Sequence, residues 1–166
     1  MPELTKRKPI RLKNHDYSLN GYYFITICSK DRQNIFGEIV NDEKSVGANG
    51  RWPVSNGIKI KLDRYIIMPN HLHCIIIINH NLTGGQPSAP TGNINRKHTL
   101  SSFVSGFKSI VTKRVNILLN TPRKPVWQRS FYDHIIRNDR SLNAIREYIS
   151  NNPVNWQLDI DNLINL

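Results

Sequence analysis

Runs of hydrophobic residues predict three strands in this chain. Residues 22–28, YYFITIC, are aromatic or β-branched almost throughout, which is typical of a strand. Over residues 58–62, isoleucine and leucine alternate with lysine, the pattern of a strand with one face in water. Residues 71–78 are largely apolar on both faces, so we expect them to form a central strand of a sheet.

Two later segments carry a helical period. Hydrophobic residues recur close to every 3.6 positions over residues 100–118, and Thr99 is placed to cap that helix at its N-terminus. A second helix is predicted from a Ser141 cap to about Asn152. Pro153 ends it, because proline disfavours the helical conformation in the residue before it.

The remaining segments predict one domain with appended ends. Residues 1–19 form a basic N-terminal arm, residues 20–156 form the domain and residues 157–166 form a C-terminal tail. Residues 40–57 and 79–98 are rich in glycine, proline and asparagine and have no helical period. We expect both to be loops, the second a flexible connection or lid within the domain.

Composition narrows the class of partner. Twenty-three lysines and arginines against twelve acidic residues give a net charge of +11 and a pI near 10.0. Such an excess attracts polyanions and favours nucleic acid over two alternatives, a merely soluble basic protein and one resting on acidic lipid. We expect no membrane span, because no run of about eighteen apolar residues occurs. The N-terminal residues do not resemble a signal peptide, and Cys28 and Cys74 lie inside apolar runs as free thiols do, so we expect a cytoplasmic protein.

His71 and His73 are the first candidates for chemistry. Residues two apart in a strand point to the same face, so the two imidazoles can converge on one cation. The alternative is a pair of packed histidines that hydrogen-bond to neighbours, which is less favourable in such an apolar strand because burying polar rings is costly. Structural zinc is disfavoured, because Cys74 faces the other side of the strand and no CxxC pair is present.

Tyr148 and Asn152 share a face of the second predicted helix. A tyrosine at that position is often only an aromatic at the rim of the buried stripe. The functional alternative is a nucleophile, because a phenol can attack phosphorus and leave a phosphotyrosine link that permits rejoining. Asn152 supplies a hard oxygen donor that can complete a metal shell with His71 and His73. Imidazoles with amide oxygen and water suit Mg²⁺ or Mn²⁺.

Four ordered segments resemble one known family. YIIMPNHLHCIIII resembles the HUH motif (His, bulky hydrophobe, His) of single-tyrosine transposases. VWQRSFYDHIIRNDRSLNAIREYISNNPVNW is similar to the C-terminal signature of their REP-associated tyrosine transposase branch. SSFVSGFKSIVTKRVN and YYFITICSKDRQNIFGEIV also resemble that branch, so the similarity extends over about residues 20–156.

The resemblance implies a fold and an activity. The fold would be α+β, a ferredoxin-like or RRM-like antiparallel sheet with helices packed on it, as in HUH nucleases. The activity would be cleavage and joining of single-stranded DNA beside a hairpin through a 5′-phosphotyrosine, by a monomer or a homodimer. His71 and His73 match the metal pair, Tyr148 the nucleophile and Asn152 the third ligand. Tyr132 is a second choice for the nucleophile.

The DNA-binding surface is expected to combine basic, aromatic and histidine side chains. Its candidates are Arg11, Lys13, Lys108, Lys113, Arg114, Trp127, Arg129, His134 and Arg137, with Tyr22 and Phe131 as further aromatics for base stacking.

One departure from the family concerns the interval between GEIV and the strand before MPNH. Family members usually carry a helix there, and here the interval is short and rich in glycine and proline. We therefore expect one sheet face to be incompletely covered. Two other functions stay open, a non-catalytic protein that binds structured nucleic acid and an RNA nuclease of unrelated mechanism.

Overall fold

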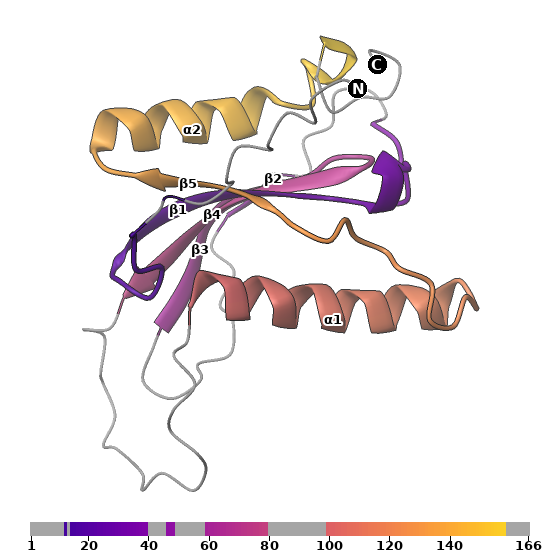
Figure 1. The fold of residues 1–166 in the computed structure, drawn as a ribbon. Helices are drawn as coiled ribbons and strands as arrows, with labels where there is room; N and C mark the ends of the chain where they lie inside the picture. The colour runs from indigo at the N-terminus through magenta and orange to yellow at the C-terminus, as the bar shows by residue number, and fades with distance from the viewer. Residues whose placement is uncertain (1–11, 13, 40–45, 49–58, 80–98, 159–166) are drawn as a thin grey trace, which may run out of the picture.

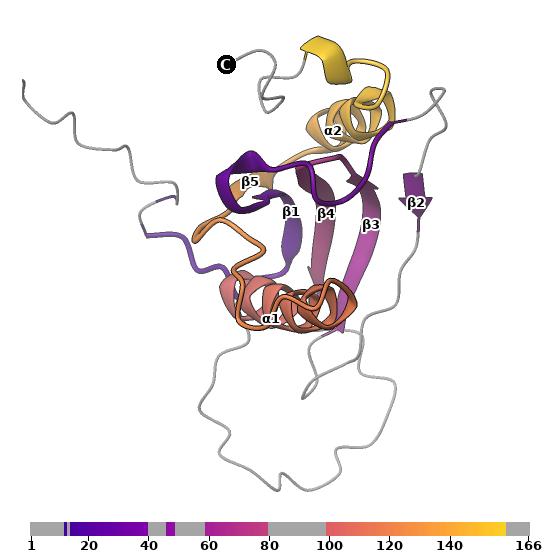
Figure 2. The ribbon, with the colours of Figure 1, turned by 90° about the vertical axis from the view of Figure 1, so that its right-hand side faces the viewer.

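An antiparallel sheet lies between two helices (Figures 1 and 2). The structure, a computed structural model, describes residue 12 and residues 14–39, 46–48, 59–79 and 99–158 of the 166. The strands, in the spatial order β2-β3-β4-β1-β5, are β1 (Gly21–Cys28), β2 (Val46–Ala48), β3 (Lys59–Ile67), β4 (His71–Asn79) and β5 (Tyr132–Ile136). The helices are α1 (Leu100–Leu118) and α2 (Asp139–Asn151), with short 3₁₀ turns η1 (Lys30–Arg32) and η2 (Trp156–Leu158).

The predicted α+β class with an antiparallel sheet is confirmed. Strands β1 and β4 pair along their whole length, Gly21 opposite Ile78 and Cys28 opposite His71, and occupy the middle of the sheet. Strands β3 and β5 flank them. The four strands β3, β4, β1 and β5 therefore lie in the spatial order of a ferredoxin-like sheet. Helix α1 has the predicted bounds, and Thr99 caps it in a reciprocal pair of hydrogen bonds with Ser102.

Other predicted boundaries are wrong. Strand β3 continues to Ile67, past the predicted end at 62, because a register shift between Leu62 and Tyr65 lets it resume pairing with β4. Helix α2 begins at Asp139, since Asn138 and not Ser141 is the cap and its side chain accepts from the Ser141 amide at 2.8 Å.

Two strands were not predicted at all. Strand β2 lies inside 40–57, which was interpreted as a loop, and pairs with β3. Strand β5 has no clear alternation and forms because β1 offers it a free edge. Residues 80–98 of the second predicted loop, residues 1–11 of the arm and residues 159–166 of the tail lie outside the described residues.

The two faces of the sheet are covered by different helices (Figure 2). Strand residues alternate between faces, so Leu72, Cys74 and Ile76 of β4 pack in the cluster that contains Leu100 and Val104 of α1. Ile75 packs instead with Leu142 and Ile149 of α2. His71 and His73 share the face of Ile75, which is the face covered by α2.

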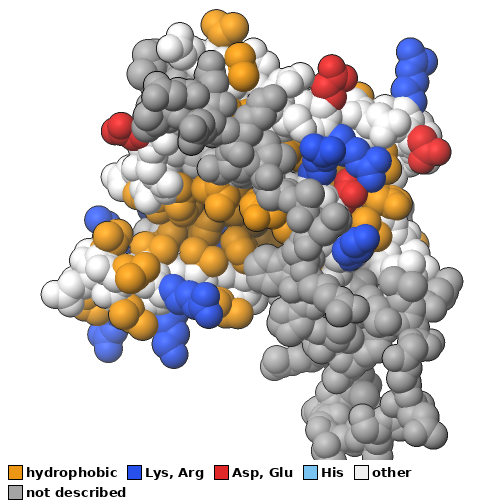
Figure 3. Space-filling model, turned by 180° about the vertical axis from the view of Figure 1, so that it is seen from behind, with side chains coloured by type: hydrophobic (Ala, Val, Ile, Leu, Met, Phe, Trp, Pro, Cys, Tyr) orange, Lys and Arg blue, Asp and Glu red, His pale blue; other side chains and the backbone are white. Residues whose placement is uncertain are grey.

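Exposed hydrophobic side chains lie on α1 within the part of the chain that the structure describes. The C-terminal half of α1 carries Ile110 and Ile117, which are 56% and 69% exposed, and Leu118, which is 81% exposed. Figure 3 shows hydrophobic side chains gathered in a hollow beside α1 when the molecule is seen from behind. The shortened interval, on which the expectation of an uncovered sheet face depended, lies largely outside the described residues. Among the described residues, no helix is long and apolar enough to span a bilayer.

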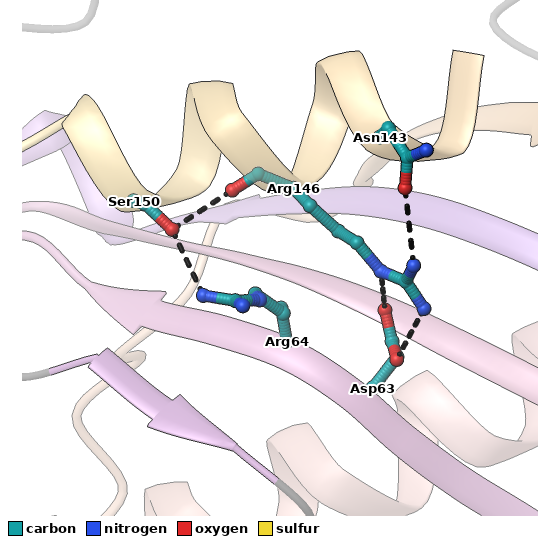
Figure 4. A network of polar contacts seen from close by, with 5 residues as sticks. All are labelled: Asp63, Arg64, Asn143, Arg146 and Ser150. Atoms are coloured by element: carbon teal, nitrogen blue, oxygen red, sulfur yellow. Dashed lines mark hydrogen bonds and ion pairs between the residues drawn. The ribbon is translucent and has the colours of Figure 1, made fainter. Parts of the chain in front are cut away.

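Polar contacts fix α2 against β3 (Figure 4). The Arg146 guanidinium donates from Nε to Asp63 Oδ2 at 2.7 Å and from Nη2 to Asp63 Oδ1 at 2.9 Å. One turn further, Arg64 donates to the hydroxyl of Ser150 at 3.0 Å, and that hydroxyl donates to the Arg146 carbonyl. Tyr148 lies between the two attachments, so its backbone position is set by β3.

Candidate active site

His71 and His73 converge as the two-residue spacing predicts. Their Nε2 atoms are 3.0 Å apart and both side chains are buried, with 0% and 2% of their surface exposed. Ordinary burial would leave these nitrogens in contact with apolar atoms. Here the two nitrogens face each other, which brings two potential lone pairs to one point in space.

A hydrogen-bond partner behind each ring orients it. His71 Nδ1 is 2.8 Å from the Asn70 side-chain oxygen, which can only accept, so Nδ1 carries the proton and Nε2 is left bare. His73 Nδ1 is 2.8 Å from Thr26 Oγ1 on β1, directly across the strand pair. Such partners on the far nitrogen are what fixes a metal-binding imidazole in its tautomer.

The strand ends hold these partners in place. Asn70 is fully buried, and its backbone carbonyl accepts from the Ser29 amide at 2.8 Å. The Met68 amide donates to the His71 carbonyl at 2.8 Å, which closes the turn between β3 and β4. The sequence pattern did not reveal Asn70 or Thr26 as site residues, because the first lies in a turn and the second comes from a strand 47 positions away.

The site disfavours a proton on His73. Burial lowers the pKa of the His73 imidazole well below its usual value, and the neighbouring His71 lowers it further. Ligation uses the neutral imidazole, so the lowered pKa keeps the His73 ring in the form that can bind a metal ion at neutral pH.

Tyr148 reaches this pair from α2. Its hydroxyl lies 3.2 Å from His73 Nε2, although the two residues are 75 positions apart in the sequence. The tyrosine is 47% exposed, and its ring packs against His73 with centroids 5.3 Å apart. The Tyr148 hydroxyl is thus held against His73 while the side chain stays partly open to solvent, so a large molecule can reach it.

Tyr132 occupies a different position on the same face. It lies opposite Thr26 on β5 and is 52% exposed. Within the described part of the chain, no hydrogen bond joins its hydroxyl to either histidine. Tyr148, and not Tyr132, therefore lies against the histidine pair in the described part of the chain.

Asn152 ends α2 as a buried amide, 3% exposed. Its side-chain oxygen has no hydrogen-bond partner among the described residues. Buried amide oxygens are nearly always satisfied, so an atom of this kind fits a ligand or an ion. Trp156 follows Asn152 and packs over His71, with ring centroids 5.8 Å apart.

The donor set fits a hard divalent cation. Neighbouring corners of an octahedron with metal–ligand distances of about 2.1 Å are about 3.0 Å apart, which matches the separation of the two Nε2 atoms. No group of three His, Cys, Asp or Glu gathers anywhere in the described ranges. The further ligands would therefore be amide, water or substrate oxygens, a set that suits Mg²⁺ or Mn²⁺ better than structural zinc.

The remaining candidates fall into three groups. Lys113, Arg114, Arg129, His134 and Arg137 are exposed, whereas Arg11 and Lys13 lie outside the described residues. Trp127 is only 8% exposed and packs between Phe36 and Phe107, so its burial argues against base stacking.

Lys108 makes contacts that set it apart from all of these candidates. Its ammonium donates to the carbonyls of Gln128 and Ser130 at 2.8 and 2.6 Å. Burial lowers its pKa. This lysine braces the segment before β5, and the contacts give no support for a direct role in binding phosphate.

Comparison with known proteins finds relatives of this chain. No protein-family model matches the chain. A Haemophilus influenzae protein described only as uncharacterised is 36% identical in an alignment of 166 positions. The alignment covers 92% of this chain and 91% of that protein. A second Haemophilus influenzae protein, provisionally named a REP-associated tyrosine transposase, is 23% identical over 144 residues, 84% of this chain and 73% of that protein.

A solved structure adds a third comparison. It is that of a REP-associated tyrosine transposase bound to a REP hairpin, 18% identical, with a TM-score of 0.46 over 88% of this chain and 74% of that chain.

The chain is similar in sequence to the protein provisionally named a REP-associated tyrosine transposase, the family that its motifs resemble. It belongs to one family with the Haemophilus influenzae protein that is 36% identical to it.

Proposed function

We propose that the chain nicks and rejoins single-stranded DNA beside hairpin-forming repeats, with Tyr148 as the nucleophile. The observation that carries this proposal is the 3.2 Å approach of the Tyr148 hydroxyl to the His73 member of the histidine pair. A merely structural tyrosine at the rim of α2 would not need to meet two inward-facing imidazoles. The hairpin comes from the solved relative, whose complex contains one.

The bonding changes are those of a phosphoryl transfer. The Tyr148 oxygen forms a bond to phosphorus, and the bond from phosphorus to the 3′ oxygen of the upstream nucleotide breaks. The products are a free 3′-hydroxyl and a 5′-phosphotyrosine, which keeps the energy of the phosphodiester for rejoining. The phenol proton can pass to water, because Tyr148 is half exposed.

His71, His73 and Asn152 would hold Mg²⁺ or Mn²⁺. The bound ion would polarise the scissile phosphate and neutralise the charge that develops on it. Asn70 and Thr26 keep the two rings turned toward each other. Trp156 covers His71 and limits the access of water from that side.

Exposed basic residues would bind the DNA backbone. Lys113, Arg114, Arg129 and Arg137 lie at the surface of a chain with a net charge of +11. Contacts of this kind release counterions, so binding should weaken steeply as salt rises. We propose that the protein acts in the cytoplasm as a monomer or a homodimer.

The test is covalent capture of DNA. Protein, Mn²⁺ and end-labelled oligonucleotides that carry a hairpin with varied single-stranded flanks are incubated and separated on a denaturing gel. We expect a protein–DNA adduct with the wild type and none with Tyr148→Phe, His71→Ala or added chelator. Tyr132→Phe is the matched control and should retain the adduct.

The other outcomes distinguish the alternatives. An adduct that persists in Tyr148→Phe would overturn the choice of nucleophile. Salt-sensitive binding without any adduct, unchanged by His71→Ala and chelator, would indicate a non-catalytic protein that binds structured nucleic acid. Cleavage without metal and without a protein-linked product would indicate the unrelated nuclease.

A further inference from the structure

A cavity of about 420 Å³ opens beside the His73–Tyr148 pair. Its walls come from β1, η1, β4, the segment before β5, β5 itself and α2. They include the side chains of Phe24, Arg32, Phe131 and Tyr132 together with His73 and Tyr148. The volume falls in the range of pockets that take a small organic group, and the walls are largely aromatic with one cationic side chain.

Phe24 organises the aromatic side of this cavity. Its ring stacks on His73 with centroids 5.4 Å apart. Tyr132 and Tyr148 both stand edge-on to Phe24, at 6.4 and 6.1 Å. Tyr148 is committed to His73, whereas the half-exposed ring of Tyr132 is open to a flat partner. Nucleic acid bases stack on aromatic rings placed in this way.

Arg32 reaches the cavity from a strained turn. Asp31 and Arg32 have φ values of 53° and 54°, in the left-handed region that residues other than glycine rarely adopt. Hydrogen bonds hold the turn there, from Ser29 Oγ to the Gln33 carbonyl at 2.7 Å and from the Lys30 amide to the Val126 carbonyl at 2.8 Å. Strain of this kind collects at sites where a side chain has to be placed.

The opposite wall is fixed by Lys108. Gln128 and Ser130 line the cavity, and the Lys108 ammonium donates to their two backbone carbonyls. The cavity is therefore held on one side by a hydrogen-bonded turn and on the other by the half-buried Lys108. A guanidinium in such a frame is suited to bind a phosphate with two hydrogen bonds.

We propose that this cavity binds the unstacked nucleotide next to the scissile phosphate. The base of this nucleotide stacks on Tyr132, and its other phosphate, which is not cleaved, binds Arg32. The occupant is a nucleotide of the single-stranded DNA, and Tyr132 and Arg32 determine how well it is held. This inference rests on the proposed nicking function, because Tyr148 and His73 form one wall of the same cavity.

Fluorescence tests the base contact without requiring the reaction. Tyr148→Phe protein is mixed with hairpin oligonucleotides that carry 2-aminopurine at successive flanking positions. We expect the fluorescence to be quenched on binding at one position, to recover with Tyr132→Ala and to stay quenched with Tyr132→Phe. Equal responses at all positions, or a quench that survives Tyr132→Ala, would overturn the proposal.

Adduct kinetics test the same contact in the wild type. Removing the base at the quenched position should slow adduct formation roughly tenfold, the size expected for one lost stacking contact. With Tyr132→Ala, the normal and abasic oligonucleotides should react at equal rates. If the wild type forms adducts and does not distinguish the two oligonucleotides, the cavity does not hold that base and only the proposed function survives.

Arg32→Gly isolates the phosphate contact. Glycine accepts the positive φ at position 32, so the turn should keep its conformation or gain stability while the guanidinium is lost. We expect slower adduct formation with unchanged thermal unfolding, and Arg32→Lys should restore only part of the rate. An unchanged rate with Arg32→Gly would remove Arg32 from the proposal. A wild type without any adduct would refute the proposed function, and the fluorescence experiment would still decide on the cavity.

Discussion

The ion pair between Arg146 and Asp63 fastens the helix that carries Tyr148, and its contribution can be measured by a double-mutant cycle. The variants are Arg146→Ala, Asp63→Ala and both together. Arg140→Ala is the matched control, because Arg140 is an exposed arginine on the same helix.

The expected magnitude follows from the geometry of the pair. Two charge-assisted hydrogen bonds of 2.7 and 2.9 Å join the side chains, which are 33% and 16% exposed. Fully exposed ion pairs contribute about 0.2–1 kcal/mol, and hydrogen bonds to charged groups about 1.5–3 kcal/mol. Paired bonds at partial exposure lie between these ranges, so we expect a coupling energy of about 1–2 kcal/mol. Each single variant should lower the midpoint of thermal unfolding by roughly 3–6 °C, at about 2–4 °C per kcal/mol for a chain of this size.

The assay combines urea unfolding with adduct formation in the same preparations. The coupling energy should decrease in about 1 M salt, since screening weakens partly exposed pairs. Adduct formation should slow several-fold in both single variants, because Tyr148 lies two positions beyond Arg146 and small misplacements of a nucleophile are costly. A coupling energy below about 0.3 kcal/mol, or full adduct rates in the variants, would refute the view that this pair positions Tyr148.

Three further predictions concern the histidine pair and its supports. Asn70→Ala should lower Mn²⁺ affinity about 10–100-fold in calorimetric titration, because the His71 ring loses the partner that sets its tautomer; unchanged affinity would contradict this role. In metal-free protein with chelator, the free energy of unfolding should fall as the pH drops below about 6.5, by up to about 1.4 kcal/mol per pH unit. The sign follows because His73 in the unfolded chain then takes up a proton, whereas folded His73, with its pKa lowered by burial, does not. A His73→Asn variant should therefore lose less stability per pH unit than the wild type. If both proteins lose stability equally with falling pH, His73 is not the cause. Ile149→Ala should lower the free energy of unfolding, measured in urea, by about 2–4 kcal/mol, since Ile149 is fully buried on the sheet-facing side of α2. A loss below about 1 kcal/mol would contradict the close packing of α2 on the sheet.

Local patterning determined much of the fold. The hydrophobic runs placed β1, β4 and α1, and Thr99 caps α1 as predicted. The two-residue spacing also put His71 and His73 on one face and Cys74 on the other, because strand side chains alternate whatever the strand packs against. These features depend on contacts between residues near one another in the chain.

Other elements depended on distant partners. Strand β5 carries a weak pattern of its own and forms through its pairing with β1. The cap of α2 is Asn138 and not Ser141, a choice between two suitable residues that the packing of α2 on β3 resolves. Lys108 and Trp127 were assigned to DNA by charge and aromatic character, and the fold places one against two carbonyls and the other in the core.

One part of the candidate site could be predicted from the sequence, and another part depended on the tertiary structure. The sequence by itself indicated the residues that we propose to carry the chemistry, since the histidine pair, Tyr148 and Asn152 stand in recognisable local patterns. Only the tertiary structure decided that Tyr148 rather than Tyr132 meets His73, that Thr26 and Asn70 orient the rings, and that a cavity opens beside them. The physical reason is that periodicity fixes the direction of a side chain within its own element. The distance between elements is fixed by the register of β1 against β4 and by the docking of α2, which are sums of many contacts spread along the whole chain.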